Sequence, residues 1–399
     1  MNRIPWFSLV LLGFLAQPAL ARTFAPIPSP PAPPPRNPIA RGVTVEYEQQ
    51  LAATAKHGLP YVKSAAKRGN VSAELVLGML DGARKDYADE ERWYRRAAKQ
   101  GNPNAEEYLG ILYFNGVGVP KNDKRAFAWE HRAAIQGDAQ AQLKLAVMFH
   151  EGVGTQRNDT KAARWALKSA KQGDAEAQLA VAIDYKYGRG LEKSTREENA
   201  WLLKSAHSGY AFAQFVVGHG YYQGERVRQN FGDALMWFRR AARQGYSPAE
   251  YFLARMYALG QAAPKDPTKA ALWLARSVGQ NYAPALTFLR HAATGWLLQA
   301  ANKGNAIAQN MIGEGYYYGR WAPQDNRLAL SWFRKSAKQR NAAAEYFLAR
   351  MYAFGQGTSR NYTKAGTWLA RSAGQGFIPA QIFMHNVTVE ASKADSLKQ

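Results

Sequence analysis

The sequence predicts an all-α fold, a right-handed superhelical solenoid of stacked antiparallel helix pairs with a period of 36 residues. Tryptophans carry the first observation, because most of them recur at this interval: positions 93, 129, 165, 201, 237 and 273, then, after one shorter step, 296, 332 and 368. Such a period is typical of stacked helix pairs, since each pair covers the hydrophobic face of the next. The second observation is that in a complete repeat a glycine follows each predicted helix, as at Gly116 and Gly137. A residue of positive φ commonly ends a helix there.

The repeat of residues 102–137 shows how each helix pair should form. Apolar residues recur at intervals of three and four along its first helix: Ala105, Leu109, Leu112 and Tyr113. They define one face of a helix, and Gly110 beside them leaves room for a second helix to approach. Asn122 or Asp123 is placed to cap that second helix, which carries the tryptophan. We expect each tryptophan of the series to be buried between helices, so that Trp165→Ala lowers the free energy of unfolding by ~3–5 kcal/mol.

The N-terminal residues have the order of a cleavable secretory signal, which we assign to residues 1–21. Arg3 precedes an apolar run, and Ala19-Leu20-Ala21 has the A-x-A form of a signal cleavage site. The apolar run is too short to span a bilayer, and no later stretch has the ~20 apolar residues of a spanning helix. Residues 22–42 follow as a proline-rich linker. We therefore expect an exported protein, periplasmic or secreted, with no transmembrane segment after signal cleavage; an uncleaved anchor is the less favoured alternative.

The charge balance predicts acidic partners. The chain holds 52 lysines and arginines against 30 aspartates and glutamates, a formal net charge of +22. Such a charge attracts acidic protein, anionic glycan, lipid headgroups or nucleic acid. Nucleic acid is an unlikely partner, because it is scarce where an exported protein resides. The chain has no cysteine, which excludes disulfides and a thiol nucleophile, so its stability must come from packing.

A longer regularity divides the repeats into two blocks. The ten residues 249–258 return unchanged at 344–353, an offset of 95 residues. We assign a first block with an irregular N-terminal unit to residues 43–295, a second block that copies 201–294 in tandem to residues 296–390, and a flexible tail to residues 391–399.

The junction between the blocks is shorter than a repeat. The step from Trp273 to Trp296 is 23 residues instead of 36, so 13 residues of the turn and the second helix are missing. We expect residues 282–304 to form an irregular joint or one merged helix, at which the superhelix changes direction.

These residues resemble the Sel-1-like repeat, a relative of the tetratricopeptide repeat. The family pattern has an alanine, Leu-Gly-x-Leu-Tyr, Gly-x-Gly-Val, an acidic or asparagine cap, Lys-Ala and Trp-Tyr-Arg-Lys-Ala-Ala-x-Gln-Gly, and residues 102–137 match it well. Related units cover residues 61–390. The resemblance implies a non-enzymatic adaptor, often of the bacterial envelope and of signalling or cell-wall processes. Some family members carry disulfides in each repeat, and this chain differs from them.

The catalytic motifs sought in the sequence are absent. It contains no G-x-S-x-G elbow, no H-E-x-x-H motif and no phosphate loop ending in Gly-Lys-Ser/Thr. The segments Gly116-Val-Gly118 and Gly152-Val-Gly154 follow a predicted helix and not a strand, which marks them as turns between helices. The seven histidines show no metal spacing. We predict no catalytic residue, no cofactor and no metal, and therefore a protein that is not an enzyme.

The side of each first helix opposite its apolar stripe is the candidate partner-binding face, because this side commonly lines the concave groove of such stacks. It is more aromatic than a solvated face should be, which leaves two interpretations. Either neighbouring repeats cover part of it, or it is a groove for a peptide or helix, with aromatic and arginine side chains as anchors. The groove candidates are Phe215, His219, Tyr222, Tyr251, Arg255, Tyr317, Tyr346 and Arg350.

A basic residue stands three positions after each tryptophan of the series except Trp296, which Gln299 follows. In a stack these residues would form a basic ribbon: Arg96, Arg132, Lys168, Lys204, Arg240, Arg276, Lys335 and Arg371. A cation near a helix C-terminus is favourable in itself, so the basic ribbon also has a purely structural explanation. As a binding surface it would suit a polyanion, such as peptidoglycan, another anionic glycan or lipid headgroups.

Two functions follow from these surfaces. The first is a protein-interaction scaffold or adaptor of the cell envelope, in signalling or envelope regulation, which binds an acidic or amphipathic partner protein in its groove. The alternative is a binder of anionic envelope polymer through the basic ribbon. A cell-wall-acting enzyme ranks third.

Overall fold

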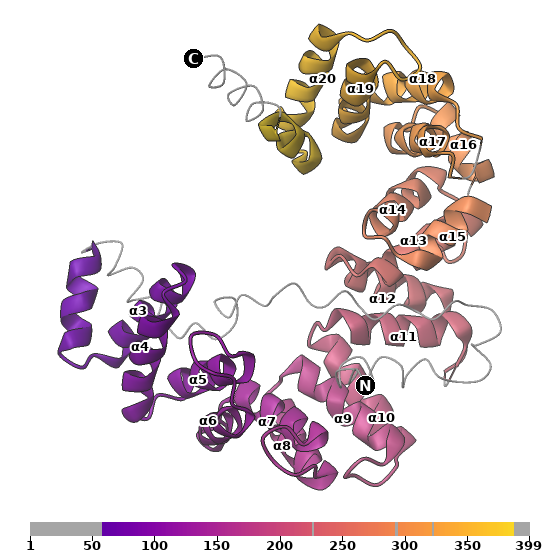
Figure 1. Cartoon of the computed structure of the whole chain (residues 1–399). Coiled ribbons are helices and arrows are strands. Elements are labelled where there is room, and N and C mark those ends of the chain that lie inside the picture. Colours follow the sequence, from indigo (N-terminus) through magenta and orange to yellow (C-terminus); the bar gives the residue numbers. More distant parts are fainter. Residues whose placement is uncertain (1–57, 226, 292–293, 321–322, 387–399) are drawn as a thin grey trace, which may run out of the picture. The chain divides into compact units, whose positions relative to one another are not determined.

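The computed structural model describes residues 58–386, apart from 226, 292–293 and 321–322, and every regular element of these residues is a helix (Figure 1). After a helix over 58–67 come α3 (Val71–Ala83), α4 (Tyr87–Lys99), α5 (Pro103–Asn115), α6 (Asp123–Ile135), α7 (Ala139–Glu151), α8 (Asp159–Lys171), α9 (Ala175–Tyr187), α10 (Thr195–His207) and α11 (Ala211–Gln223). The later helices are α12 (Phe231–Arg243), α13 (Ser247–Leu259), α14 (Pro267–Gly279), α15 (Ala283–His291), α16 (Thr294–Asn302), α17 (Ala306–Tyr318), α18 (Asn326–Ala337), α19 (Ala342–Phe354), α20 (Tyr362–Gly374) and a helix over 378–386.

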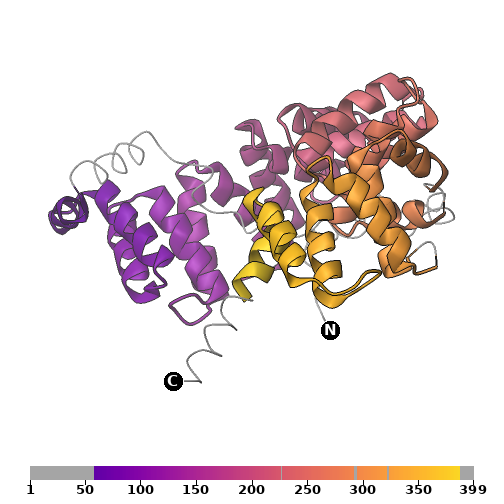
Figure 2. The ribbon, with the colours of Figure 1, turned by 90° about the horizontal axis from the view of Figure 1, so that it is seen from above.

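The chain divides into two compact units, Met1–Gln214 and Phe215–Gln399. In the first unit α5 packs against α6, α6 against α7 and α7 against α8, and in the second α12, α13 and α14 pack in the same succession. Figures 1 and 2 show the order of the helices from two directions. This packing confirms the predicted all-α solenoid of helix pairs.

Capping side chains begin the helices, and glycines end them, where the sequence predicts. Asn122 caps α6, because its side-chain oxygen accepts a hydrogen bond of 2.9 Å from the backbone N–H of Arg125. Asp123 is then the first residue of the helix. Gly116 ends α5 with a φ of 70°, a left-handed conformation that glycine adopts without steric cost.

The core of each helix pair contains the residue after the tryptophan, whereas most of the tryptophans themselves lie at its edge. The buried residues at this position are Tyr94, Glu130, Ala166, Leu202, Phe238, Leu274, Leu297, Phe333 and Leu369. Of the nine tryptophans in the series, Trp201 and Trp237 are buried, whereas the other seven, Trp165 among them, are half-buried. The expectation that every tryptophan is buried was therefore wrong, and the expected cost of Trp165→Ala falls below ~3–5 kcal/mol.

A small residue on the first helix explains this orientation. Gly313 of α17 faces the ring of Phe333, and a Cβ atom on Gly313 would lie 2.6 Å from Cε1 of that ring. Neighbouring residues of a helix point about 100° apart. When Phe333 faces Gly313, Trp332 must therefore lie at the edge of the helix pair, where it is half-buried.

Hydrogen bonds of the same kind join the two helices of several repeats. A buried serine near the end of the second helix donates to a carbonyl oxygen near the start of the first helix. Examples are Ser169 to Ala139 at 2.7 Å, Ser277 to Ser247 at 2.8 Å and Ser336 to Ala306 at 2.7 Å. Because buried polar groups are costly without partners, these bonds fix the position of one helix along the other.

The repeat is shortened near the junction of the two blocks. Helices α15 and α16 have nine residues each, whereas α14 and α17 on either side have 13. Helix α14 contacts α15, α16 and also α17. Residues 292–293 between the short helices lie outside the described residues, so the choice between a joint and one merged helix stays open. The change of superhelix direction also stays a prediction.

Several assignments from the sequence fall on other residues that the structure does not describe. They are the signal 1–21, the linker 22–42, the first residues of the repeats up to 57 and the tail 391–399. Within the described residues, every helix is too short or too polar to cross a membrane.

Candidate functional site

Most of the groove candidates are buried side chains of the second unit. The exposed fraction is 0% for Phe215, 8% for Tyr222, 6% for Tyr251 and 5% for Tyr317. Neighbouring helices supply the cover, since the ring of Phe252 in α13 lies 5.8 Å from that of Phe215 and 5.2 Å from that of Tyr222. For these four residues the burial favours packing between repeats over direct contact with a partner.

His219 also lies inside this aromatic cluster. Its ring is 5.8 Å from that of Phe215 and 5.3 Å from that of Phe252, and burial lowers the pKa of His219 to about 4. The imidazole is therefore neutral at physiological pH and acts as one more packed ring. It offers no positive charge to an acidic partner.

Arg255, Tyr346 and Arg350 are the groove candidates that remain half-exposed. The guanidinium of Arg255 lies 5.7 Å from the centre of the Tyr251 ring, and that of Arg350 lies 5.8 Å from the Tyr346 ring. No carboxylate of the described residues pairs with either arginine. Aromatic rings hold both guanidinium groups in place. Arg255 also donates a hydrogen bond to the hydroxyl of Tyr251, so its remaining N–H groups are the ones available to a partner.

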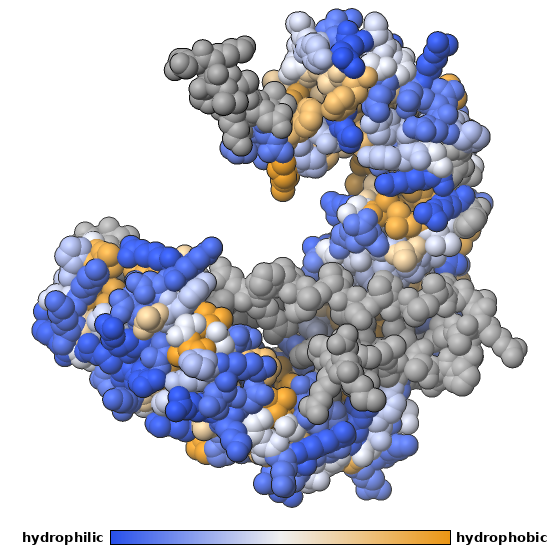
Figure 3. Space-filling model, viewed as in Figure 1, coloured by the Kyte–Doolittle hydropathy of each residue, from blue (hydrophilic) through white to orange (hydrophobic). Residues whose placement is uncertain are grey.

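Exposed apolar residues that the sequence analysis missed lie one helical turn beyond these arginines. Leu259 is 52% exposed and Phe354 is 53% exposed. Each is the last residue of its helix, directly before a left-handed glycine. An apolar residue immediately before such a glycine is a signal that could have identified them, because the end of a helix projects beyond the cover of its neighbours. On the face shown in Figure 3, hydrophobic residues form small patches among hydrophilic ones.

The side chains of the basic ribbon lie over the tryptophan rings. In every one of the eight cases the cation is close to the ring three residues earlier, from 3.8 Å for Lys168 over Trp165 to 5.0 Å for Arg132 over Trp129. Such cation–π contacts stabilise both groups by ~0.5–1 kcal/mol at exposed sites. They also explain why a tryptophan suits the edge of a helix pair.

The arginines of the basic ribbon have a second role, which depends on one buried position of the first helix. Where that position holds glutamate, the ribbon residue is arginine: Glu74 with Arg96, Glu106 with Arg132, Glu250 with Arg276 and Glu345 with Arg371. An ion pair of 2.9 Å joins Glu106 to Arg132, and another of 2.9 Å joins Glu345 to Arg371. A buried carboxylate requires such a partner.

Where the same position holds glutamine, the ribbon residue is lysine in three of four repeats: Gln142 with Lys168, Gln178 with Lys204 and Gln309 with Lys335, whereas Gln214 stands with Arg240. The glutamine amide donates to a backbone carbonyl of the preceding helix, as from Gln142 to Ala134 at 3.1 Å. No charge is then buried at this position, so the lysine has no buried carboxylate to neutralise. All eight cations of the basic ribbon lie over tryptophans. Four of them are arginines that stand with a buried glutamate of the first helix, and the other four have no such glutamate.

One interface of the first unit has an ionic core. Glu107, Glu130 and Lys144 stand 108 residues, or three repeats, before Phe215, Phe238 and Phe252. In the second unit the three phenylalanine rings lie 5.0–5.8 Å apart. In the first unit Lys144 pairs with Glu107 and lies 3.7 Å from Oε1 of Glu130, while Oε2 of Glu130 has no hydrogen-bond partner.

Burial raises the pKa of Glu130 to about 8, and the nearby Lys144 opposes this rise while Glu107 and Asp138 add to it. Between the ordinary pKa of 4.5 and about 8, the folded protein holds a proton that the unfolded chain releases. Stability from this group therefore falls as pH rises through that window. We expect the stability of the wild type relative to Glu130→Gln to decrease from pH ~5 to ~8 in thermal unfolding. Parallel curves for the two proteins would contradict this assignment.

The described residues contain no group of three histidine or acidic side chains that could hold a metal ion. His150 lies beside a carboxylate, with its Nδ1 2.9 Å from Oδ1 of Asp159. Burial lowers the pKa of His150, and Arg157 also contacts Asp159 at 3.0 Å. These contacts join His150, Asp159 and Arg157 into a local polar network.

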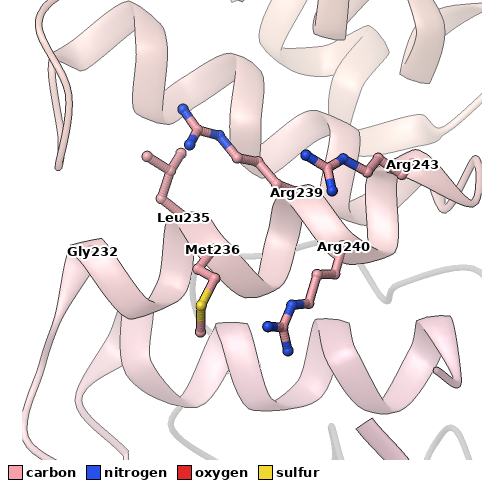
Figure 4. A pocket seen from close by; sticks show the side chains of 6 residues that line it. All are labelled: Gly232, Leu235, Met236, Arg239, Arg240 and Arg243. Carbon is pink, nitrogen blue, oxygen red and sulfur yellow. The ribbon is translucent and has the colours of Figure 1, made fainter. Parts of the chain in front are cut away.

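A shallow depression of about 310 Å³ lies along α12, lined by Gly232, Leu235, Met236, Arg239, Arg240 and Arg243 (Figure 4). Two of its arginines have contacts within the protein. Arg239 donates to the hydroxyl of Tyr257, and Arg240 lies 4.6 Å from the ring of Trp237. The depression is thus a basic surface and not a preformed pocket for a small molecule.

Comparison with known proteins agrees with this architecture. A family model described as the Sel1 repeat matches residues 72–102, 103–138, 139–174, 175–210, 211–246, 247–282, 290–305, 306–341 and 342–377. None of the curated proteins matches the chain.

Two solved structures have comparable sequences. A protective antigen of uropathogenic Escherichia coli strains, which displays an SLR fold, is 30% identical with a TM-score of 0.51; the match covers 87% of this chain and 79% of that one. A Sel1 repeat protein from Oxalobacter formigenes is 32% identical with a TM-score of 0.40, and the match covers 84% of this chain and 93% of that one. From the matched repeats and the stacked helix pairs, the chain belongs to the Sel1 repeat family.

Proposed function

We propose that this protein is a scaffold of the cell envelope that holds an acidic or amphipathic partner protein against the helices of its second unit. Sel1 repeat proteins are generally protein-interaction scaffolds. The observation that carries the proposal is the state of Arg255 and Arg350, which are half-exposed and have no carboxylate partner among the described residues. Arginine and aromatic side chains dominate the energetics of protein interfaces.

The arrangement around these arginines suits a protein partner. Tyr346 is half-exposed beside Arg350, and Phe354 is exposed one turn further along α19. A partner that carries both carboxylates and apolar side chains satisfies both kinds of group. The proposed location in the envelope, periplasmic or secreted, rests on the signal pattern of residues 1–21.

The second candidate function is binding of anionic envelope polymer through the basic ribbon. The net charge of +22 supports it. The ribbon cations that are not assigned to a glutamate are the ones available for this role: Lys168, Lys204, Arg240 and Lys335. Such binding would weaken steeply with salt, because exposed charges are screened.

Affinity capture from an envelope extract tests the proposal. We expect the wild type to retain a discrete protein at low and at moderate salt, and the double variant Arg255→Gln, Arg350→Gln to lose it. The matched control replaces two ribbon cations, Lys168→Gln and Lys335→Gln, and should keep the partner. Circular dichroism verifies that each variant is folded. Capture unchanged in the double arginine variant would contradict the proposal, and capture lost only in the control would favour the basic ribbon.

A further inference from the structure

The second unit contains the same local arrangement twice. The hydroxyl of Tyr222 donates to Oε1 of Gln261 at 3.2 Å, and 95 residues later that of Tyr317 donates to Oε1 of Gln356 at 2.7 Å. Likewise Arg239 donates to the hydroxyl of Tyr257, and Arg334 donates to that of Tyr352. Residues related by the offset of 95 therefore share side-chain contacts as well as sequence.

Each of the two arrangements presents one arginine and one exposed apolar residue. Site 1 is Arg255 with Leu259 on α13, and site 2 is Arg350 with Phe354 on α19. Residues four apart on a helix lie on the same face. Each site thus places a cation and an apolar side chain one helical turn apart.

Comparison with the other repeats shows that this combination is specific to the two sites. The same two positions hold Ile111 and Asn115, Val147 and Glu151, Ile183 and Tyr187, His219 and Gln223, or Glu314 and Tyr318. At the position between the sites, Glu314 is held by Asn310, whose amide donates to its Oε1 at 2.7 Å. No ion pair joins Glu314 to Arg255 or Arg350.

The chemistry of the two arginines indicates what each site would bind. Arg350 lies 5.8 Å from the ring of Tyr346 and 5.9 Å from that of Tyr317, and Arg255 lies 5.7 Å from Tyr251 and 5.9 Å from Phe252. Two rings hold each guanidinium, so little conformational freedom is lost when it binds. A carboxylate accepts two N–H groups of such a fork.

Resting on the proposed function, we propose that sites 1 and 2 bind one partner protein at two places, each site taking a carboxylate and the apolar side chain next to it. The occupant is an acidic, amphipathic segment that carries this pair of side chains twice. Charge complementarity supports it, because both arginines lack a carboxylate within the described residues. The second contact then forms within one complex, which raises the affinity by a factor of ~10²–10⁴ over a single contact.

Fluorescence anisotropy with two synthetic helical peptides tests this inference on the full chain. The first peptide carries one Glu-x-x-x-Leu pair, and the second carries two such pairs joined by a flexible Gly-Ser linker. We expect the single-pair peptide to occupy two equal sites per chain. The double-pair peptide should bind once per chain, and ~10² to 10⁴ times more tightly.

Two variants and two controls make the outcome decisive. Arg255→Gln and Arg350→Gln should each remove one of the two sites, and each should reduce the affinity for the double-pair peptide to that for the single-pair peptide. Lys335→Gln should change neither value, and peptides with glutamine in place of glutamate should not bind. Loss of all binding in only one arginine variant would overturn the bivalent arrangement and leave the proposed function intact. Peptide binding that neither variant changes would overturn both.

Discussion

Phe333→Ala should lower the free energy of unfolding by ~3–5 kcal/mol, the range of large truncations in a core, whereas Trp332→Ala should cost clearly less. The ring of Phe333 is fully buried and stacks on that of Phe347 at 4.7 Å. The ring of Trp332 is half-buried, with the ammonium of Lys335 at 4.1 Å. The two substitutions are one residue apart on α18, so they differ mainly in the face of the helix that they alter.

Urea denaturation followed by circular dichroism measures both effects, provided that the slope of each transition is compared as well as its midpoint. Repeat arrays can unfold in parts, and a changed slope in one variant would reveal this. An equal or larger effect of Trp332→Ala would contradict the assignment of Phe333 as the core residue.

The second large effect concerns the buried ion pair of α5 and α6. Arg132→Met should destabilise the protein by ~3 kcal/mol, the lower end of the cost of an unpaired buried charge, because the side chain of Arg132 is itself 55% exposed. Glu106 is 0% exposed and lies 2.9 Å from Nη2 of Arg132. Gln136 alone, which donates to Oε2 of Glu106 at 2.6 Å, does not neutralise the charge.

The repeats themselves supply the control for this experiment. The double variant Glu106→Gln, Arg132→Lys reproduces the pair found at Gln142 and Lys168. It should recover most of the stability that Arg132→Met loses, because no charge is then buried without a partner. A double-mutant cycle of Glu106→Gln and Arg132→Met in thermal unfolding measures the coupling of the two positions. Coupling near zero would show that Arg132 acts only through its contact with Trp129.

The sequence was sufficient for the period, the helix pairs, the caps and the shortened junction, because these depend on local residue chemistry. It did not show which face of each second helix points into the core. Tryptophan is the most conspicuous apolar residue, but Gly313 and its equivalents receive the side chain that follows it. A pattern of large residues cannot by itself show which small residue they face.

The groove candidates stay predictions as a binding site. Arg255 and Arg350 lie on first helices of their repeats, as the sequence pattern indicates. The pattern could not show that Phe215 and Tyr222 are covered by α13, because that cover depends on the spacing between neighbouring repeats. Leu259 and Phe354 were missed because they lie past the last turn of the periodic pattern.

The pairing of glutamate with arginine and of glutamine with lysine limits which duplications of repeats keep each buried carboxylate with its cation. Both partners belong to one repeat, so a duplication with breakpoints between repeats copies the acid together with its cation. A crossing-over inside a repeat would join the first helix of one class to the second helix of another. The shortened repeat at the junction holds Leu286 at the acidic position and Gln299 in place of the cation. With neither charge present, this repeat has no carboxylate at that position to leave unpaired.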